Sequence, residues 1–194
     1  MVETVRTRRQ GKKNIYIHND LSNSAFHFKK QIEKKLSADD RNGLAFEYMS
    51  CLVMLAFTIE AKVNFIGHKA ISNWKERLPF DKKINKVLKH LKISPNWNKR
   101  PYSSLESLKG FRDFIAHGKP METEFDEEVE LLKEEIDRRI DLDSEWVAYC
   151  SHENVFNTYD DVDLIWKELI RGAGIEPHET ITHGSLGLTI IGKL

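Results

Sequence analysis

The amino-acid sequence predicts an all-α protein, a bundle of five or six helices with a short β-prone tail at its C-terminal end. Apolar residues recur at three- and four-residue spacing in most stretches of the 194-residue chain, which is the period of an amphipathic helix. Glycine and proline stand at the ends of several of these stretches. Hydrophobic residues make up 40% of the chain, which is sufficient for one domain with a core.

We expect three parts along the chain: an N-terminal arm over residues 1–19, a helical domain over 20–174 and a tail over 175–194. The arm carries a cluster of Lys and Arg followed by a short strand-like stretch over 14–18. Such an arm either contacts nucleic acid or extends loosely from the domain. The tail alternates Thr, Ile and Leu with glycine, so it is expected to form a strand or hairpin, or to dock on a second subunit.

The second of the expected helices is the hydrophobic centre of the domain. Asp20 caps a first helix over about 20–36, and the second follows over about 38–66. This second helix is apolar on more than one face, so it should be surrounded by its own domain or by a partner subunit. Its most apolar run, 51–59, is too short to span a bilayer. With no signal peptide and only two cysteines, we expect a cytoplasmic protein with no membrane association.

Further helices are expected over 81–92, 103–117, 123–140 and from Asp160 or Asp161 to Gly172, and the stretches 67–77 and 144–157 carry weaker helical patterns. The helix over 81–92 combines an apolar stripe with an outer face of lysines: Lys82, Lys83, Lys86, Lys89 and Lys92. The helix over 123–140 is acidic, with an apolar stripe that should be buried.

Charge is distributed unevenly although the net charge is zero. Residues 62–119 carry fourteen Lys/Arg against four Asp/Glu, whereas residues 121–180 carry five against nineteen. This asymmetry either creates a basic surface for nucleic acid and an acidic one for a partner, or lets two oppositely charged halves attract each other.

The stretch from Ser103 to Pro120 carries the clearest indication of function. It predicts a helix that contains Arg112 and Asp113 and ends near His117 and a glycine. An arginine and a histidine that meet at a helix end suit the chemistry of a phosphate. On a continuous helix Arg112 and His117 would lie about 140° apart, so they converge only if the helix ends near Ala116 and His117 turns back.

The segment Arg112-Asp113-Phe114-Ile115-Ala116-His117 resembles the R-x4-6-H motif of the HEPN superfamily, small helical proteins of prokaryotic defence and toxin–antitoxin systems. The resemblance covers roughly residues 38–140, including the polar pair Glu60 and Asn64 upstream. It implies a metal-independent endoribonuclease, needing no cofactor, in which a homodimer pairs two motifs. Arg112 and His117 would be catalytic, Asp113 would orient one of them, and Glu60 and Asn64 would support them. The implied products are a 2′,3′-cyclic phosphate and a 5′-hydroxyl.

The loop before the motif mixes aromatic and cationic residues. Aromatic rings beside cations can stack on and neutralise single-stranded RNA. The expected RNA-binding residues are Trp97, Lys99, Arg100, Tyr102 and Lys119. In the other interpretation, Trp97 and Tyr102 only anchor the loop on the core. The expected partners are RNA, a second copy, and an antitoxin or another protein.

Two alternatives to catalysis remain open from the sequence. The chain could be a non-catalytic HEPN-like module that binds RNA or protein, or a purely structural helical dimer. In either case Arg112 could pair with Asp113 or Glu106, and His117 could be a plain helix C-cap. Catalysis requires Arg112 and His117 to be exposed in one shared cleft.

Overall fold

The computed structural model describes residues 4–118 and 145–193, and alternate residues between 120 and 132. The protein is mostly helical, with a two-stranded sheet formed by the two ends of the chain. In order, the elements are β1 (Val5–Asn14), α1 (Ile17–Ser37), α2 (Leu44–Ala70), α3 (Phe80–Leu91), α4 (Ser103–His117), α5 (Glu145–Tyr149), α6 (His152–Gly172), the 3-10 helix η2 (Pro177–Thr180) and β2 (His183–Lys193). The body is thus a helical bundle, as the sequence predicts.

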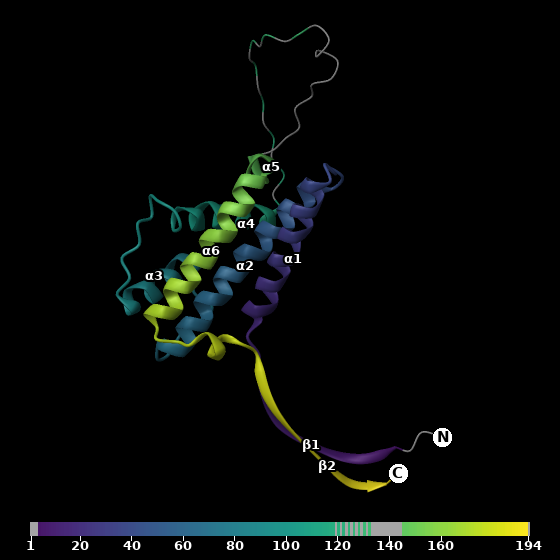
Figure 1. Ribbon diagram of the computed structural model, residues 1–194. Coiled ribbons are helices and arrows are strands. Elements are labelled where there is room, and N and C mark those ends of the chain that lie inside the picture. The colour runs from purple at the N-terminus through teal and green to yellow at the C-terminus, as the bar shows by residue number, and fades with distance from the viewer. Residues whose placement is uncertain are drawn as a thin grey trace.

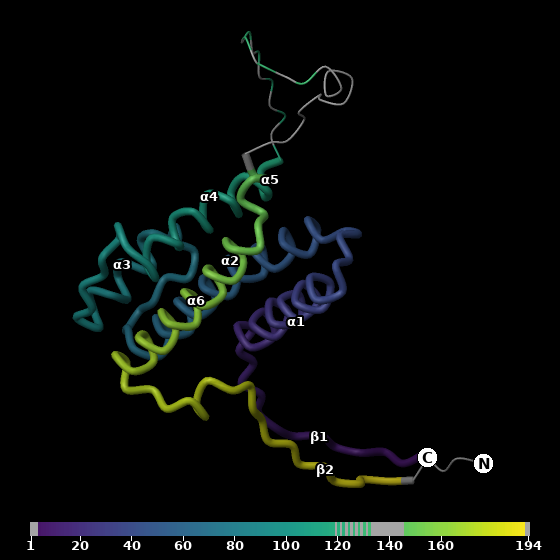
Figure 2. The backbone as a smooth tube through the Cα atoms, turned by 45° about the horizontal axis from the view of Figure 1, so that its top comes forward, coloured from purple at the N-terminus to yellow at the C-terminus, as the bar shows by residue number. Residues whose placement is uncertain are grey.

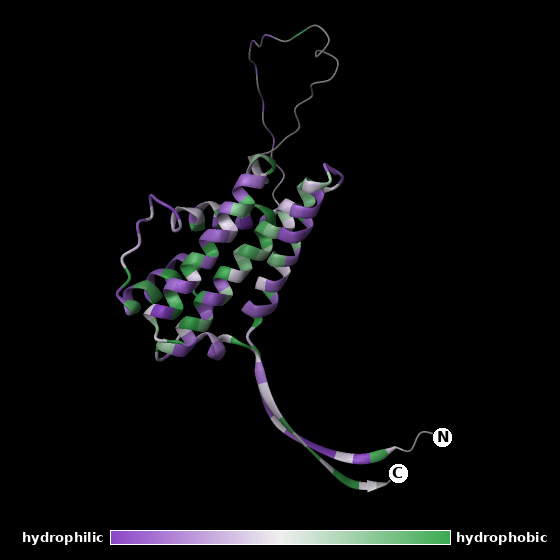
Figure 3. Cartoon of the chain, in the orientation of Figure 1, coloured by the Kyte–Doolittle hydropathy of each residue, from purple (hydrophilic) through white to green (hydrophobic). Residues whose placement is uncertain are grey.

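Helix α2 lies at the centre of this bundle, between α1 and α6 (Figure 1). Ile59, Val63 and Ile66 on α2 are almost fully buried, and α3 and α4 pack against the helix as well. Figure 3 shows the apolar residues gathered where the helices face one another. The prediction of a surrounded central helix is confirmed, although α2 begins at Leu44 rather than near residue 38. Gly43 adopts the left-handed conformation and ends the turn that precedes α2.

By length and composition α2 could also cross a membrane. In the bundle, however, 56% of its most apolar stretch is buried, as in the core helix of a water-soluble protein. This burial is compatible with a soluble protein.

The helix expected over 67–77 does not form, because α2 continues through Gly67 to Ala70. Gly67 does not end α2. It makes room for the ring of Trp74, which a Cβ at this position would meet at 2.3 Å. The next helix, α3, agrees with the prediction for 81–92, and Ile84, Val87 and Leu88 form its buried stripe. Lys83 is the exception on the predicted outer face, because its side chain is only 1% exposed.

The segment expected to form two helices over 144–172 divides earlier than predicted. A short α5 ends at Tyr149, and α6 then runs without interruption from His152 to Gly172. Ser151 caps α6, since its hydroxyl accepts a hydrogen bond from the backbone N–H of Asn154 at 3.2 Å. The expected cap near Asp160 therefore lies inside the helix. Most of the acidic helix expected over 123–140 falls outside the described residues.

The two ends of the chain form one antiparallel ribbon, with Asn14 opposite His183 and Val5 opposite Lys193. The ribbon extends away from the helical body, and both termini lie at its far end (Figures 1 and 2). The strand-like stretch expected over 14–18 differs from the structure, because α1 already begins at Ile17. The tail does form a strand, and its partner is the N-terminal arm.

Candidate functional site

Helix α4 presents the motif at the edge of the bundle. Leu105, Leu108 and Phe111 bury one side of α4 against the core. The helix ends at Gly118, whose backbone is left-handed (φ 50°) and whose N–H donates to the carbonyl of Phe114 at 3.1 Å. His117 is therefore the last helical residue and does not turn back toward Arg112. The two residues keep the separation of a continuous helix, about 140° around its axis.

Arg112 is held by two carboxylates and remains partly exposed. Its Nη2 lies 3.6 Å from Oε2 of Glu60, and its Nε lies 3.3 Å from Oδ1 of Asp113. A quarter of the Arg112 side chain is exposed to solvent. The structure thus brings together three of the expected site residues and fixes the direction of the guanidinium.

Two lysines join the same network. The ammonium of Lys83, which is buried, donates to Oε1 of Glu60 and to the carbonyl of Glu76. Lys109 donates to Oδ2 of Asp113 at 2.9 Å. Desolvation by burial opposes ionisation of Asp113, but the hydrogen bond from Lys109 and the charges of Arg112, Lys109 and His117 outweigh it and lower the pKa of this carboxyl. Asp113 is therefore a carboxylate at neutral pH.

His117 and Asn64 lie apart from this network. The imidazole of His117 is exposed at the end of α4. Asn64 lies on α2 one turn after Glu60, and its buried Oδ1 accepts no hydrogen bond from any described residue. The cavity beside Glu60 and Arg112 has a volume of only about 10 Å³. A phosphate would consequently meet Arg112 at the open surface.

The loop before α4 is fastened to α6 by two of its expected RNA-binding residues. The Tyr102 ring is buried, and its hydroxyl donates to Oε2 of Glu168 at 2.7 Å. Nε of Arg100 donates to Oδ2 of Asp161 at 2.8 Å, and its Nη1 donates to Oδ1 of Asn157 at 2.7 Å. Both side chains are therefore committed to contacts within the chain. These contacts favour the anchoring interpretation for Tyr102, and they anchor Arg100 as well.

The other three residues expected to bind RNA differ in accessibility. Lys99 is exposed. Trp97 is 38% exposed, packs edge-on against Tyr102 and lines a cavity of about 230 Å³ together with Asp81 and Glu106. These carboxylates disfavour a phosphate there. Lys119 lies outside the described residues.

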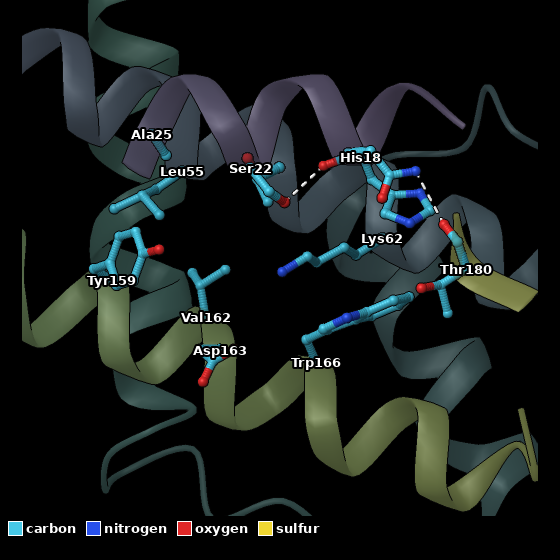
Figure 4. Close-up of a pocket in the computed structure, with 12 residues that line it drawn as sticks. His18, Ser22, Ala25, Leu55, Lys62, Tyr159, Val162, Asp163, Trp166 and Thr180 are labelled. Atoms are coloured by element: carbon cyan, nitrogen blue, oxygen red, sulfur yellow. Dashed lines mark hydrogen bonds between the residues drawn. The ribbon is translucent and has the colours of Figure 1, made fainter. Parts of the chain in front are cut away.

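A larger cavity, which sequence reasoning missed, lies between α1, α2 and α6 (Figure 4). Its volume is about 240 Å³. It is lined by His18, Asn19, Ser22, Ala25, Leu55, Thr58, Lys62, Tyr159, Val162, Asp163, Trp166 and Thr180. Lys62 is only 7% exposed, and its ammonium lies 5.2 Å from the centre of the Trp166 ring. The sequence does contain a signal, because Thr58 and Lys62 are polar residues four apart within the mostly apolar helix α2.

Burial lowers the pKa of two titratable groups that line the cavity, Lys62 and His18. Desolvation, opposed only by the charge of Asp163, lowers the pKa of Lys62 to about 8. Desolvation and the charge of Lys62 lower the pKa of His18 to about 4, against the effect of a hydrogen bond with the backbone of Thr180. At neutral pH the cavity therefore holds a neutral imidazole beside a buried ammonium.

Within the described ranges 4–118 and 145–193, no three His, Cys, Asp or Glu side chains gather as the ligands of a metal ion. Cys51 and Cys150 are both buried and unbridged. Comparison with known protein families, with curated proteins and with solved structures finds no match for this chain. The functional interpretation consequently depends on the residues of the chain and their geometry.

Proposed function

We propose that this chain is a metal-independent endoribonuclease whose active site is completed when two copies pair. The observation that supports it most is the partly exposed Arg112, which Glu60 and Asp113 hold in place on the helix that ends at the exposed His117. A fixed guanidinium at the surface suits a scissile phosphate, because it offers a permanent charge and several donors. The resemblance of this segment to the HEPN motif points to the same chemistry.

In this proposal His117 removes the proton from the RNA 2′-OH or protonates the leaving 5′-oxygen, and Arg112 stabilises the charge that develops on the phosphate. Since the two side chains lie on different sides of α4, one copy does not direct both at the same phosphate. Two copies that pack along α4 would bring Arg112 of each next to His117 of the other. The protein would act in the cytoplasm, in a defence or toxin–antitoxin setting.

The test is cleavage of a mixed RNA pool in EDTA by the wild type, Arg112→Ala and His117→Ala. We expect the wild type to cut and both folded variants to lose activity by at least about a hundredfold, the usual contribution of a general acid or base. Products with 2′,3′-cyclic phosphate ends would identify the reaction. The matched control is His90→Ala, an exposed histidine on α3, which should keep full activity. Cleavage that survives both motif substitutions contradicts the proposal.

The dimer is tested separately by mixing Arg112→Ala with His117→Ala. If each site takes Arg112 from one copy and His117 from the other, a mixed dimer contains one site in which both residues are intact. The mixture should therefore regain part of the wild-type activity, whereas each variant alone stays inactive. If the two variants exchange subunits and no activity returns, the pairing of Arg112 and His117 across two copies is wrong.

A second candidate function, RNA binding without cleavage, is favoured by two observations. Arg112 already has two carboxylates as partners, so a phosphate would compete with them. In addition, β1 carries five Lys/Arg and neither strand of the ribbon carries a carboxylate. Retention of RNA on a filter with no cleavage by the wild type would favour this candidate over the nuclease.

A further inference from the structure

The cavity between α1, α2 and α6 contains the features of a ligand site that is distinct from the motif on α4. Lys62 extends from α2 into the middle of the cavity, across the face of Trp166 (Figure 4). The other titratable residues that line the cavity are His18 from α1 and Tyr159 and Asp163 from α6. Leu55 and Val162 add apolar surface.

Several polar groups of this cavity have no partner among the residues that the structure describes. Among the described residues, no hydrogen bond or ion pair reaches the Lys62 ammonium, although the residue is only 7% exposed. The nearby Asp163 is engaged with Lys167, whose ammonium lies 2.7 Å away. Buried Thr58 Oγ1 and His18 Nε2 also have no partner. Since an unpaired ammonium is costly to bury, the cavity is suited to an anion that would pair with it.

The charges around Lys62 limit which anion fits. Lys62 is the single cation among the residues that line the cavity, and the Asp163 carboxylate, which also lines it, is already paired with Lys167. One ammonium compensates the charge of a singly charged carboxylate, whereas a doubly charged phosphate would keep one uncompensated negative charge near Asp163. The volume of about 240 Å³ is below the range of drug-sized ligands and fits a small molecule.

We propose that this cavity binds a small monocarboxylate with a flat or apolar body. Its carboxylate pairs with the ammonium of Lys62, and its body packs against Trp166, Leu55 and Val162. Tyr159 also lines the cavity, and its hydroxyl supplies a further donor, whereas the hydroxyl of Ser22 already donates to the carbonyl of His18. The proposal does not depend on the nuclease, since none of these residues belongs to the network around Arg112.

The experiment is a titration of the full chain with benzoate, followed by calorimetry and by the change in tryptophan fluorescence, to which Trp166 in the cavity contributes. Butyrate and 3-phenylpropionate are titrated as two further monocarboxylates of different size. We expect at least one of the three to bind with a dissociation constant of about 1 mM or tighter, given its few atoms. The melting temperature of the protein should rise with the concentration of that ligand.

Charge and position are tested by matched controls. Lys62→Met should weaken binding by at least about tenfold, because a charge-assisted hydrogen bond is lost. Lys69→Met changes an exposed lysine on the same helix and should leave binding unchanged. Of the uncharged and dianionic probes, benzamide should bind at least about tenfold more weakly than benzoate, and inorganic phosphate should not compete.

The pH dependence gives a readout that a structural role of Lys62 would not produce. Binding should weaken as the pH rises above about 8, where Lys62 loses its proton, and this dependence should be absent in Lys62→Met. If no monocarboxylate binds saturably, or if benzamide binds as tightly as benzoate, the proposal is wrong and the cavity holds ordered water.

Discussion

At the residue scale, His18 makes the stability of the protein depend on pH. Its ring packs against Phe65 and Trp166, and only 3% of the residue is exposed. In the folded protein its pKa is lowered to about 4, whereas the unfolded chain binds the proton at the ordinary value of 6.5. The unfolded state therefore binds more protons between these values, so the stabilising contribution that is complete above pH 6.5 disappears as the pH falls to 4.

We expect the free energy of unfolding to fall by on the order of 3 kcal/mol from this group alone between pH 7 and pH 4. The measurement is urea unfolding at a series of pH values. His18→Phe should show a smaller decrease than the wild type, because phenylalanine keeps the ring packing and has no proton to bind. His68→Phe, which changes an exposed histidine, should retain the dependence of the wild type. Equal pH profiles for His18→Phe and the wild type would contradict the prediction.

Lys62 gives a second prediction at this scale, in a higher range of pH. Its pKa of about 8 in the folded protein lies below the ordinary 10.5, so the folded state contains a buried charge at pH 7. Lys62→Met removes this charge. We expect the substitution to raise the free energy of unfolding at pH 7 by about 1–3 kcal/mol, and so to raise the melting temperature by several degrees. The advantage should shrink as the pH rises from 8 toward 10.5, because the wild-type side chain then becomes neutral in the fold. Differential scanning calorimetry at pH 7 and pH 10 measures both effects.

At the element scale, the contact between Arg100 and Asp161 joins the loop before α4 to helix α6. Asp161 is only 1% exposed, and it accepts hydrogen bonds from Arg100 and from the hydroxyl of Ser104. Removing Arg100 leaves a buried carboxylate with one donor fewer. We expect Arg100→Ala to destabilise the protein by about 2 kcal/mol. This is less than the loss of a fully buried ion pair would cost, because the Arg100 side chain is half exposed. Lys99→Ala, its exposed neighbour, should change stability by less than about 0.5 kcal/mol.

RNA retention by the same two variants separates structure from binding. If Arg100 acts only as an anchor, Arg100→Ala retains RNA as the wild type does once measured well below its unfolding temperature. Lys99→Ala should weaken retention if the exposed lysine contacts phosphate. A loss of retention confined to Arg100→Ala would instead give that residue a direct role in binding.

Sequence periodicity predicts elements best where burial follows a single stripe. The stripes of α3 and α4 are buried as expected, because their apolar spacing matches the helix period over several turns. The pattern places Lys83 on an exposed face, because it does not reveal that Glu60 of another helix lies within reach. It misplaces the start of α6 for a similar reason, since Asp161 makes a tertiary contact with Arg100 and Ser151 caps the helix instead.

At the scale of the whole molecule, the ribbon is the feature that the sequence could not place. Its two strands are separated by the entire helical body, and nothing in the local pattern of either strand identifies the other. The register does give the ribbon two unlike faces, because opposite residues point to the same side. Leu186, Leu188 and Ile190 line one face, opposite Gly11, Arg9 and Thr7. Arg8, Gln10 and Lys12 line the other, opposite small residues.

The last prediction concerns this polar face of the ribbon. Arg8 and Lys12 are exposed and make no ion pair with a described residue, so they are free to contact phosphates. If the chain binds RNA through the ribbon, replacing both by Gln should reduce the slope of log affinity against log salt concentration by about 1.4, or about 0.7 for each contact to a single strand. The melting temperature should hardly change, because the ribbon stands away from the helical body (Figure 2).

The control replaces Lys82 and Lys89, two exposed lysines of α3, by Gln and so removes the same charge from another surface. This variant should keep the salt dependence of the wild type. An equal reduction in both variants would mean that RNA responds to total charge and does not select the ribbon. A reduction confined to the α3 variant would indicate that RNA binds the helical body instead of the ribbon. That surface would lie beside the network around Arg112, because Lys83 of α3 joins this network through Glu60.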